Sequence, residues 1–131
     1  MRRSSHRWVA WSLCAAWAGV IFYFSSRAGS SLPGGYSIQG HLGEYFILGA
    51  LLTWALADEA PGVSTVVLAV LLASLYGVSD EFHQQFVPMR TPDVLDWALD
   101  TTGATIGALG AMTALLRVAR TRQHPAGSDA A

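Results

Sequence analysis

Residues 8–24 read WVAWSLCAAWAGVIFYF and contain no charged side chain. At a rise of about 1.5 Å per residue this stretch forms a helix about 25 Å long, at the short end of what spans a bilayer. The stretch is longer than the apolar part of a usual secretory signal peptide, and no A-x-A-like cleavage site follows it. It therefore predicts a membrane-spanning helix near the N-terminus.

The composition of the 131-residue chain indicates the same class of protein. Hydrophobic residues make up 52% of the chain and charged residues only 13%, whereas an average soluble domain carries about 25% charged residues. So few charges cannot cover the surface of a water-soluble globule. The composition also excludes a disordered chain and, with a net charge of −1, a nucleic-acid-binding protein with a basic face.

Three further apolar stretches follow the first, over about residues 42–57, 63–78 and 94–116. We therefore expect an all-α fold, a polytopic membrane protein built as a four-transmembrane-helix bundle over residues 1–122. Residues 123–131 are mostly small and polar, which predicts a disordered C-terminal tail.

The arginines predict how this bundle is oriented. All eight basic residues are arginines, and six of them lie outside the first and last apolar stretches: Arg2, Arg3, Arg7, Arg117, Arg120 and Arg122. Positive residues favour the cytoplasmic side of a membrane. We expect both termini to be cytoplasmic, which an even number of spans permits, with loops 25–40 and 79–93 on the outer side.

Polar side chains gather at the three helix ends that this orientation places on the outer side. They come from the start of the second stretch, the end of the third and the start of the fourth. The candidate site residues among them are His41, Glu44, Asp80, Glu81, His83, Gln84, Asp96 and Asp100, with Arg90 from the connecting loop.

Helical spacing places some of these side chains on common faces. His41 and Glu44 are three residues apart and share a face. Asp80, His83 and Gln84 also share one if the third helix continues to residue 84. The spacing thus predicts a shared site rather than scattered surface charges.

The fourth stretch carries a stripe of its own, formed by Asp93, Asp96 and Asp100 and continued by Gly103 and Gly107. The threonine and proline before Asp93 also fit a helix start, where Asp93 would cap the first turn. The two glycines have the small-xxx-small spacing that lets another helix approach closely. This face predicts either a homo-oligomer contact or a contact with a membrane partner.

The balance of charge in this region is negative. Six of the nine acidic residues belong to it, and Arg90 is the one basic residue certain to be near. Closely spaced carboxylates in a medium of low dielectric need compensation. Arg90 pairs with some of them, some hold protons, or a divalent cation binds. The sequence leaves these three alternatives open, and with them the identity of any metal.

These motifs resemble the VanZ-like family of small bacterial membrane proteins, over about residues 17–107. The matching segments are Phe24-Ser25-Ser26, His41-x-x-Glu44-Tyr45, Ser79-Asp80-Glu81-Phe82-His83-Gln84-x-Phe86-x-Pro88-x-Arg90 and Asp96-x-x-x-Asp100-x-x-Gly103-x-x-x-Gly107. Met89 stands where members of the family often have glycine. The resemblance implies an integral protein of the bacterial cytoplasmic (inner) membrane and a link with low-level resistance to the glycopeptide teicoplanin.

Three classes of function fit these observations. The first is a protein that binds or modifies an outer-leaflet amphiphile, such as a cell-wall lipid intermediate or a glycopeptide. Its candidate catalytic residues are Asp80, Glu81, His83, Arg90 and Asp96, and its candidate binding residues are His41, Glu44, Gln84 and Asp100. Arg90 is expected to contact a phosphate or carboxylate of that ligand.

The other two classes are a structural or accessory subunit of a larger membrane complex and a proton- or cation-coupled carrier of small solutes. For the carrier, Glu44, Asp96 and Asp100 would form the buried relay. The nearly featureless inner halves of the second and third stretches argue against a path through the membrane. The chain contains no G-x-S-x-G, H-E-x-x-H or phosphate-binding loop motif, so the sequence leaves open whether it is an enzyme.

Overall fold

The computed structural model describes residues 2–28, 38–57 and 61–123, with side chains from Arg7 onward. This part of the chain forms four helices and no strand: α1 (Arg2–Ser25), α2 (Ile38–Leu56), α3 (Val63–Gln84) and α4 (Val94–Gln123). The predicted all-α architecture of four helices is confirmed. The predicted tail lies outside the described residues except for Gln123, and most of the first predicted outer loop lies outside them too.

Two helices extend into the polar sequence. α2 begins at Ile38, so His41 lies inside its first turn, and α3 continues through the segment Ser79–Gln84. The α3 extension is stable because Asp80 and Gln84 are buried and the Gln84 amide bonds to the Asp80 carboxylate four residues earlier. Asp80, His83 and Gln84 therefore lie on one continuous helix, as the predicted common face requires.

The closest helix packing is between α2 and α4, and the glycines of α4 make it possible. A Cβ atom on Gly103 would meet the backbone of Leu42, and one on Gly107 would meet the backbone of Phe46. Gly49 of α2 faces the backbone of Ala104 in the same way. The small-xxx-small stripe therefore packs against α2 of the same chain. The sequence pattern predicted a second copy or a membrane partner for this face.

Many large apolar side chains lie on the outside of the bundle, while its interior also holds buried polar groups. Leu71 and Ile106 are 53% and 55% exposed, whereas Ala73, Ala104 and Asp100 are fully buried. Large apolar side chains on the outside with small and polar ones inside are typical of helices surrounded by lipid.

By length and composition, three of the described helices can cross a membrane: Arg7–Ser25 of α1, Val63–Gln84 and Val94–Arg122 of α4. In α2 the polar residues His41 and Glu44 occupy the first two turns. Its remaining part, Tyr45–Leu56, reaches only about 18 Å, less than the roughly 30 Å of the hydrocarbon core. The structure thus indicates a membrane protein with three clear candidate spans, and the polar start of α2 is the reason that the fourth is less clear.

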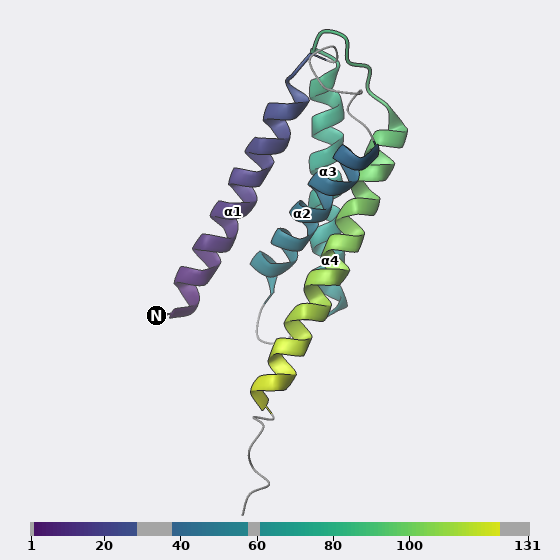
Figure 1. The fold of residues 1–131 in the computed structure, drawn as a ribbon. Coiled ribbons are helices and arrows are strands. Elements are labelled where there is room, and N and C mark those ends of the chain that lie inside the picture. The colour runs from purple at the N-terminus through teal and green to yellow at the C-terminus, as the bar shows by residue number, and fades with distance from the viewer. Residues whose placement is uncertain (1, 29–37, 58–60, 124–131) are drawn as a thin grey trace, which may run out of the picture.

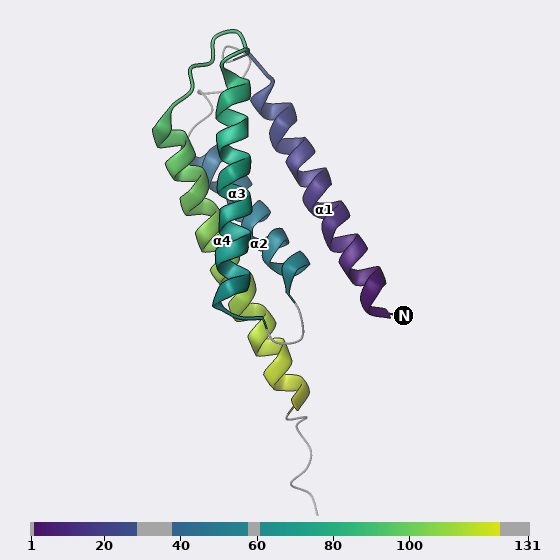
Figure 2. The same ribbon diagram turned by 180° about the vertical axis from the view of Figure 1, so that it is seen from behind.

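The arrangement of the helices brings the polar ends together. Figure 1 shows the start of α1 and the end of α4 at one end of the bundle, with the connection between α3 and α4 at the other. The reverse view shows α3 and α4 side by side, while α1 leans away from the other three toward its N-terminus (Figure 2). The ends of α1 and α3 and the start of α4 therefore lie at the same end of the molecule.

Candidate functional site

A buried histidine and two aspartates join α2 to α4. The His41 Nδ1 atom lies 2.9 Å from Asp100 Oδ1, and its Nε2 atom lies 3.6 Å from Asp96 Oδ2. His41 is 1% exposed and Asp100 is fully buried. The hydrogen bond between His41 and Asp100 satisfies one polar atom on each side chain, which is costly to bury alone, and Asp96 adds a second carboxylate near the ring.

Glu81 of α3 completes this group. Ligand atoms of His41, Glu81 and Asp100 all lie within 4.8 Å of one another. The other Glu81 contact is at the start of α4, where Oε2 accepts a hydrogen bond of 2.9 Å from the Asp93 backbone N–H. We call His41, Glu81, Asp96 and Asp100 the histidine–carboxylate cluster; it draws its members from three helices.

Asp80 and Gln84 support this cluster from α3. The Gln84 Nε2 atom donates to Asp80 Oδ2 at 3.1 Å and lies 3.4 Å from Glu81 Oε1. One amide thus faces two neighbouring carboxylates and reduces the repulsion between them. This arrangement requires a regular helix through residue 84, because only then do positions 80, 81 and 84 meet.

Several buried oxygen atoms around the cluster have no hydrogen-bond partner among the described residues. They include Asp100 Oδ2 and Tyr45 Oη. Asp100 Oδ2 faces α3 at Gly77, where an added Cβ would lie 3.3 Å from it. The glycine therefore leaves the space into which this carboxylate oxygen projects.

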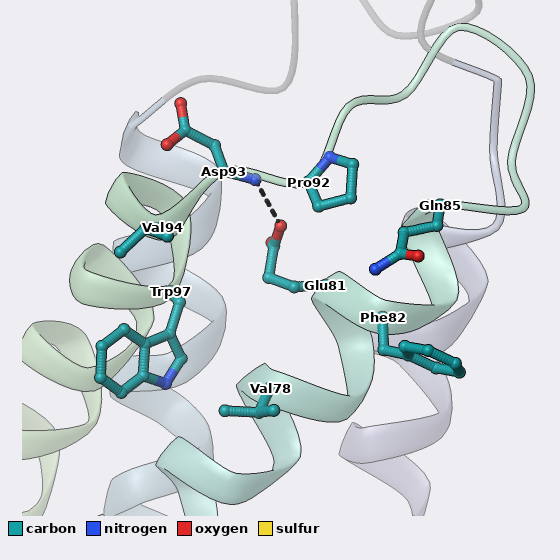
Figure 3. A pocket seen from close by; sticks show the side chains of 8 residues that line it. All are labelled: Val78, Glu81, Phe82, Gln85, Pro92, Asp93, Val94 and Trp97. Carbon is teal, nitrogen blue, oxygen red and sulfur yellow. Dashed lines mark hydrogen bonds between the residues drawn. The ribbon is translucent and has the colours of Figure 1, made fainter.

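An open groove of about 420 Å³ lies beside the cluster, between the end of α3 and the start of α4 (Figure 3). Its lining is mainly apolar and consists of Val78, Glu81, Phe82, Gln85, Pro92, Asp93, Val94 and Trp97. The Trp97 indole is held in place because its Nε1 donates to the Ser74 carbonyl oxygen at 3.2 Å. Glu81 is the residue that this groove shares with the histidine–carboxylate cluster.

Asp93 at the edge of the groove caps α4. Its Oδ1 accepts a hydrogen bond of 2.8 Å from the Leu95 backbone N–H. The interpretation of Asp93 as a helix cap is confirmed.

Arg90 and His83 contact α1. Arg90 donates from Nε to the Arg27 carbonyl and from Nη2 to the Phe24 carbonyl, both at 3.2 Å. A guanidinium at the C-terminal end of a helix satisfies its last carbonyls and its dipole. These contacts hold the end of α1. The pairing of Arg90 with the acids or with a ligand anion stays a prediction.

His83 faces the same helix. Its Nε2 atom lies 3.0 Å from Ser26 Oγ, and its ring stacks on Phe22 with centroids 4.5 Å apart. Glu44 also lies in a turn that is joined to α1, since its carbonyl accepts a 2.9 Å hydrogen bond from the Trp17 indole. The predicted site residues thus divide into the cluster with its Asp80 and Gln84 support, and a set that ties α1 to the bundle.

Sequence reasoning missed the groove residues Val78 and Trp97 and the role of Gly77. A signal for Gly77 was present: Ala69, Ala73 and Gly77 are small residues four apart, on the face that continues to Glu81. Such spacing indicates a helix face in close contact with a neighbour.

The His41 and Asp100 motifs lie in the part of the chain that a family model describes. The model, VanZ/LLP1, matches residues 39–117. The chain belongs to the VanZ/LLP1 family. No curated protein and no solved structure matches the chain. The match begins at the start of α2 and ends in the last third of α4, so the VanZ/LLP1 region contains the whole cluster and the groove.

Proposed function

We propose that this member of the VanZ/LLP1 family binds an amphiphilic envelope molecule from the outer leaflet of the bacterial cytoplasmic membrane. The ligand is a cell-wall lipid intermediate or a glycopeptide that carries an acyl chain. One observation carries the proposal: Glu81 lies both in the wall of the α3–α4 groove and in the histidine–carboxylate cluster. An apolar tail in the groove would bring the attached polar head to this carboxylate.

The groove has the character expected of a site for an apolar chain. Val78, Phe82 and Val94 line it and are 52%, 60% and 75% exposed. Pockets for small amphiphiles combine such apolar walls with a few polar groups that fix orientation. In this proposal Glu81 is the polar group that meets the ligand head, and His41 lies behind it in the cluster.

His41 supplies a buried base behind Glu81 in the cluster. When its Nδ1–H donates to Asp100 Oδ1 at 2.9 Å, its Nε2 is left as the basic nitrogen. That nitrogen is buried and lies 3.6 Å from Asp96 Oδ2, so it acts on the carboxylates of the cluster and not on the ligand directly. Asp80 and Gln84 hold Glu81 in position, and Arg90 and His83 position α1 beside the site.

The orientation of the bundle supports access from the outer leaflet. Six arginines lie at the two chain termini, and the start of α1 and the end of α4 lie at the same end of the bundle (Figure 1). With four crossings and both termini cytoplasmic, the groove and cluster face the outer side.

The test is expression in a glycopeptide-susceptible bacterial host at matched membrane levels. We expect the wild-type chain to raise the inhibitory concentration of teicoplanin several-fold. Glu81→Gln and Val78→Trp should abolish this protection, because one removes the shared carboxylate and the other fills the groove. Leu71→Trp, seven residues before Val78 on the same helix face and outside the groove, is the matched control and should retain protection.

A second drug distinguishes the two ligand sources. Protection against teicoplanin but not against a glycopeptide without an acyl chain indicates that the drug itself binds, whereas equal protection indicates a cell-wall intermediate. The proposal fails if wild type gives no protection against either drug. Full protection by both Glu81→Gln and Val78→Trp would also overturn it and favour an accessory-subunit role.

A further inference from the structure

We infer that His41, Glu81 and Asp100 together hold one divalent cation of the zinc type. This metal would lie in the site proposed above, and its role in binding an amphiphile rests on the proposed function. Metal binding itself is measured without any amphiphile, so the two can fail separately.

The donor atoms are already close to a ligand set. The three residues offer one imidazole nitrogen and two carboxylates, with ligand atoms within 4.8 Å of one another. Zinc bonds of about 2.0–2.2 Å in a tetrahedron place neighbouring ligand atoms about 3.4 Å apart. His41 Nδ1 and Asp100 Oδ1 lie 2.9 Å apart as a hydrogen-bonded pair, so binding one ion would displace the shared proton, separate these two atoms slightly and draw the Glu81 carboxylate toward them.

A second observation at Asp100 points to a ligand. Its side chain is fully buried, and Oδ2 has no hydrogen-bond partner among the described residues. This oxygen projects toward α3 at Gly77, one turn before Glu81, where a Cβ would approach to 3.3 Å. Leaving a buried carboxylate oxygen unsatisfied is costly, and a cation bound between Asp100 and Glu81 would satisfy it.

The local charge favours a cation over a proton alone. Asp96 Oδ2 lies 3.6 Å from His41 Nε2, so three carboxylates surround one imidazole. In a medium of low dielectric a divalent cation offsets carboxylates more effectively than a single imidazolium.

The donor types select the metal. Magnesium and calcium prefer sites made only of oxygen atoms, whereas an imidazole with carboxylates suits zinc and related transition ions. Three protein ligands leave a fourth position for water or a ligand atom. Because Glu81 also lines the α3–α4 groove, such a position is accessible to a molecule in the groove.

The experiment uses the full chain, purified in detergent through a tag without histidine and stripped with a chelator. Titration with Zn²⁺ alone is expected to show one ion per chain. His41→Gln, Glu81→Gln and Asp100→Asn should each weaken binding by tenfold or more. His83→Gln is the matched control and should bind as wild type, since His83 contacts α1.

A second measurement does not depend on the variants folding. Co²⁺ bound to the wild-type chain should give the visible absorption of a tetrahedral site with nitrogen and oxygen ligands, and Zn²⁺ should displace it. The inference is overturned if wild type binds no Zn²⁺, if Mg²⁺ displaces Zn²⁺ at comparable concentration, or if correctly folded Glu81→Gln binds as wild type. Teicoplanin protection by a wild type that binds no Zn²⁺ would leave the proposed function standing and remove only the metal.

Discussion

Met89 lies in the turn that precedes Arg90, and its backbone conformation is unusual. Its φ is 60°, the left-handed region, and it is the one non-glycine with positive φ in the described part of the chain. The Arg90 N–H bonds to the Val87 carbonyl at 3.2 Å, so Pro88 and Met89 are the central residues of a tight turn. Proline followed by positive φ is the pattern of a type II turn, which favours glycine at the Met89 position. This turn presents the Arg90 side chain to the end of α1.

We predict that Met89→Gly stabilises the protein by about 0.5–1 kcal/mol. A left-handed conformation costs an L-residue about 1–2 kcal/mol, and glycine avoids this cost. The greater freedom of glycine in the unfolded chain offsets part of the stabilisation. Met89→Ala removes the same exposed side chain without relieving the backbone, and should bring no gain. Denaturant titration of the full chain in detergent measures all three proteins. Equal stability of the glycine and alanine variants would contradict the account of the turn.

At the scale of elements, the α2–α4 contact decides where the site forms. The backbones of Leu42 and Phe46 lie where side chains on Gly103 and Gly107 would be. Packing this close sets the depth and rotation of α2, and with them the place at which His41 meets Asp100. Residues 41 and 100 are brought together by this packing, since each lies on a different helix.

We predict that Gly107→Ala destabilises the protein by about 1–3 kcal/mol, because the added methyl meets Phe46 backbone atoms that cannot rotate away. Gly110→Ala is the control: it lies on the same helix with nothing within 4 Å of an added Cβ. It should be neutral or gain up to about 1 kcal/mol from helix propensity. The readouts are the unfolding free energy and the Zn²⁺ affinity. Equal stability of the two variants would show that α2 and α4 do not pack this closely.

At the scale of the whole molecule, the terminal arginines and the helix arrangement together predict how the bundle is oriented in the membrane. α1, α3 and α4 are long and apolar enough to span, while α2 carries a polar start that the bundle buries. If all four helices cross, both termini lie on one side and the connection between α3 and α4 lies on the other.

We predict that a reporter fused after Arg122 is active only in its cytoplasmic form, and that one inserted after Met89 is active only outside the cytoplasm. The reason is the excess of arginine at the two termini, which resists translocation. Fusion after Ala57, in the connection between α2 and α3, is expected to report the cytoplasm and tests the crossing of α2 directly. If the reporter fused after Arg122 is active outside the cytoplasm, the proposed orientation is wrong.

The sequence by itself determined the class of protein and the polar end of the bundle. Long apolar stretches with few charges form helices in a membrane, because a helix satisfies its own backbone hydrogen bonds. Helical periodicity was enough to place Asp80 beside Gln84, and to identify the small-residue face at Gly103 and Gly107, because both are properties of a single helix.

Only the tertiary structure decided which polar groups meet. His41 binds Asp100, a residue 59 positions away in the sequence. Arg90 and His83 contact α1. Val78 and Trp97 line the α3–α4 groove. Local spacing gives the face on which a side chain lies but not the rotation of one helix against another. That rotation is set by contacts between distant small residues, such as Gly49 with Ala104, which no short-range pattern contains.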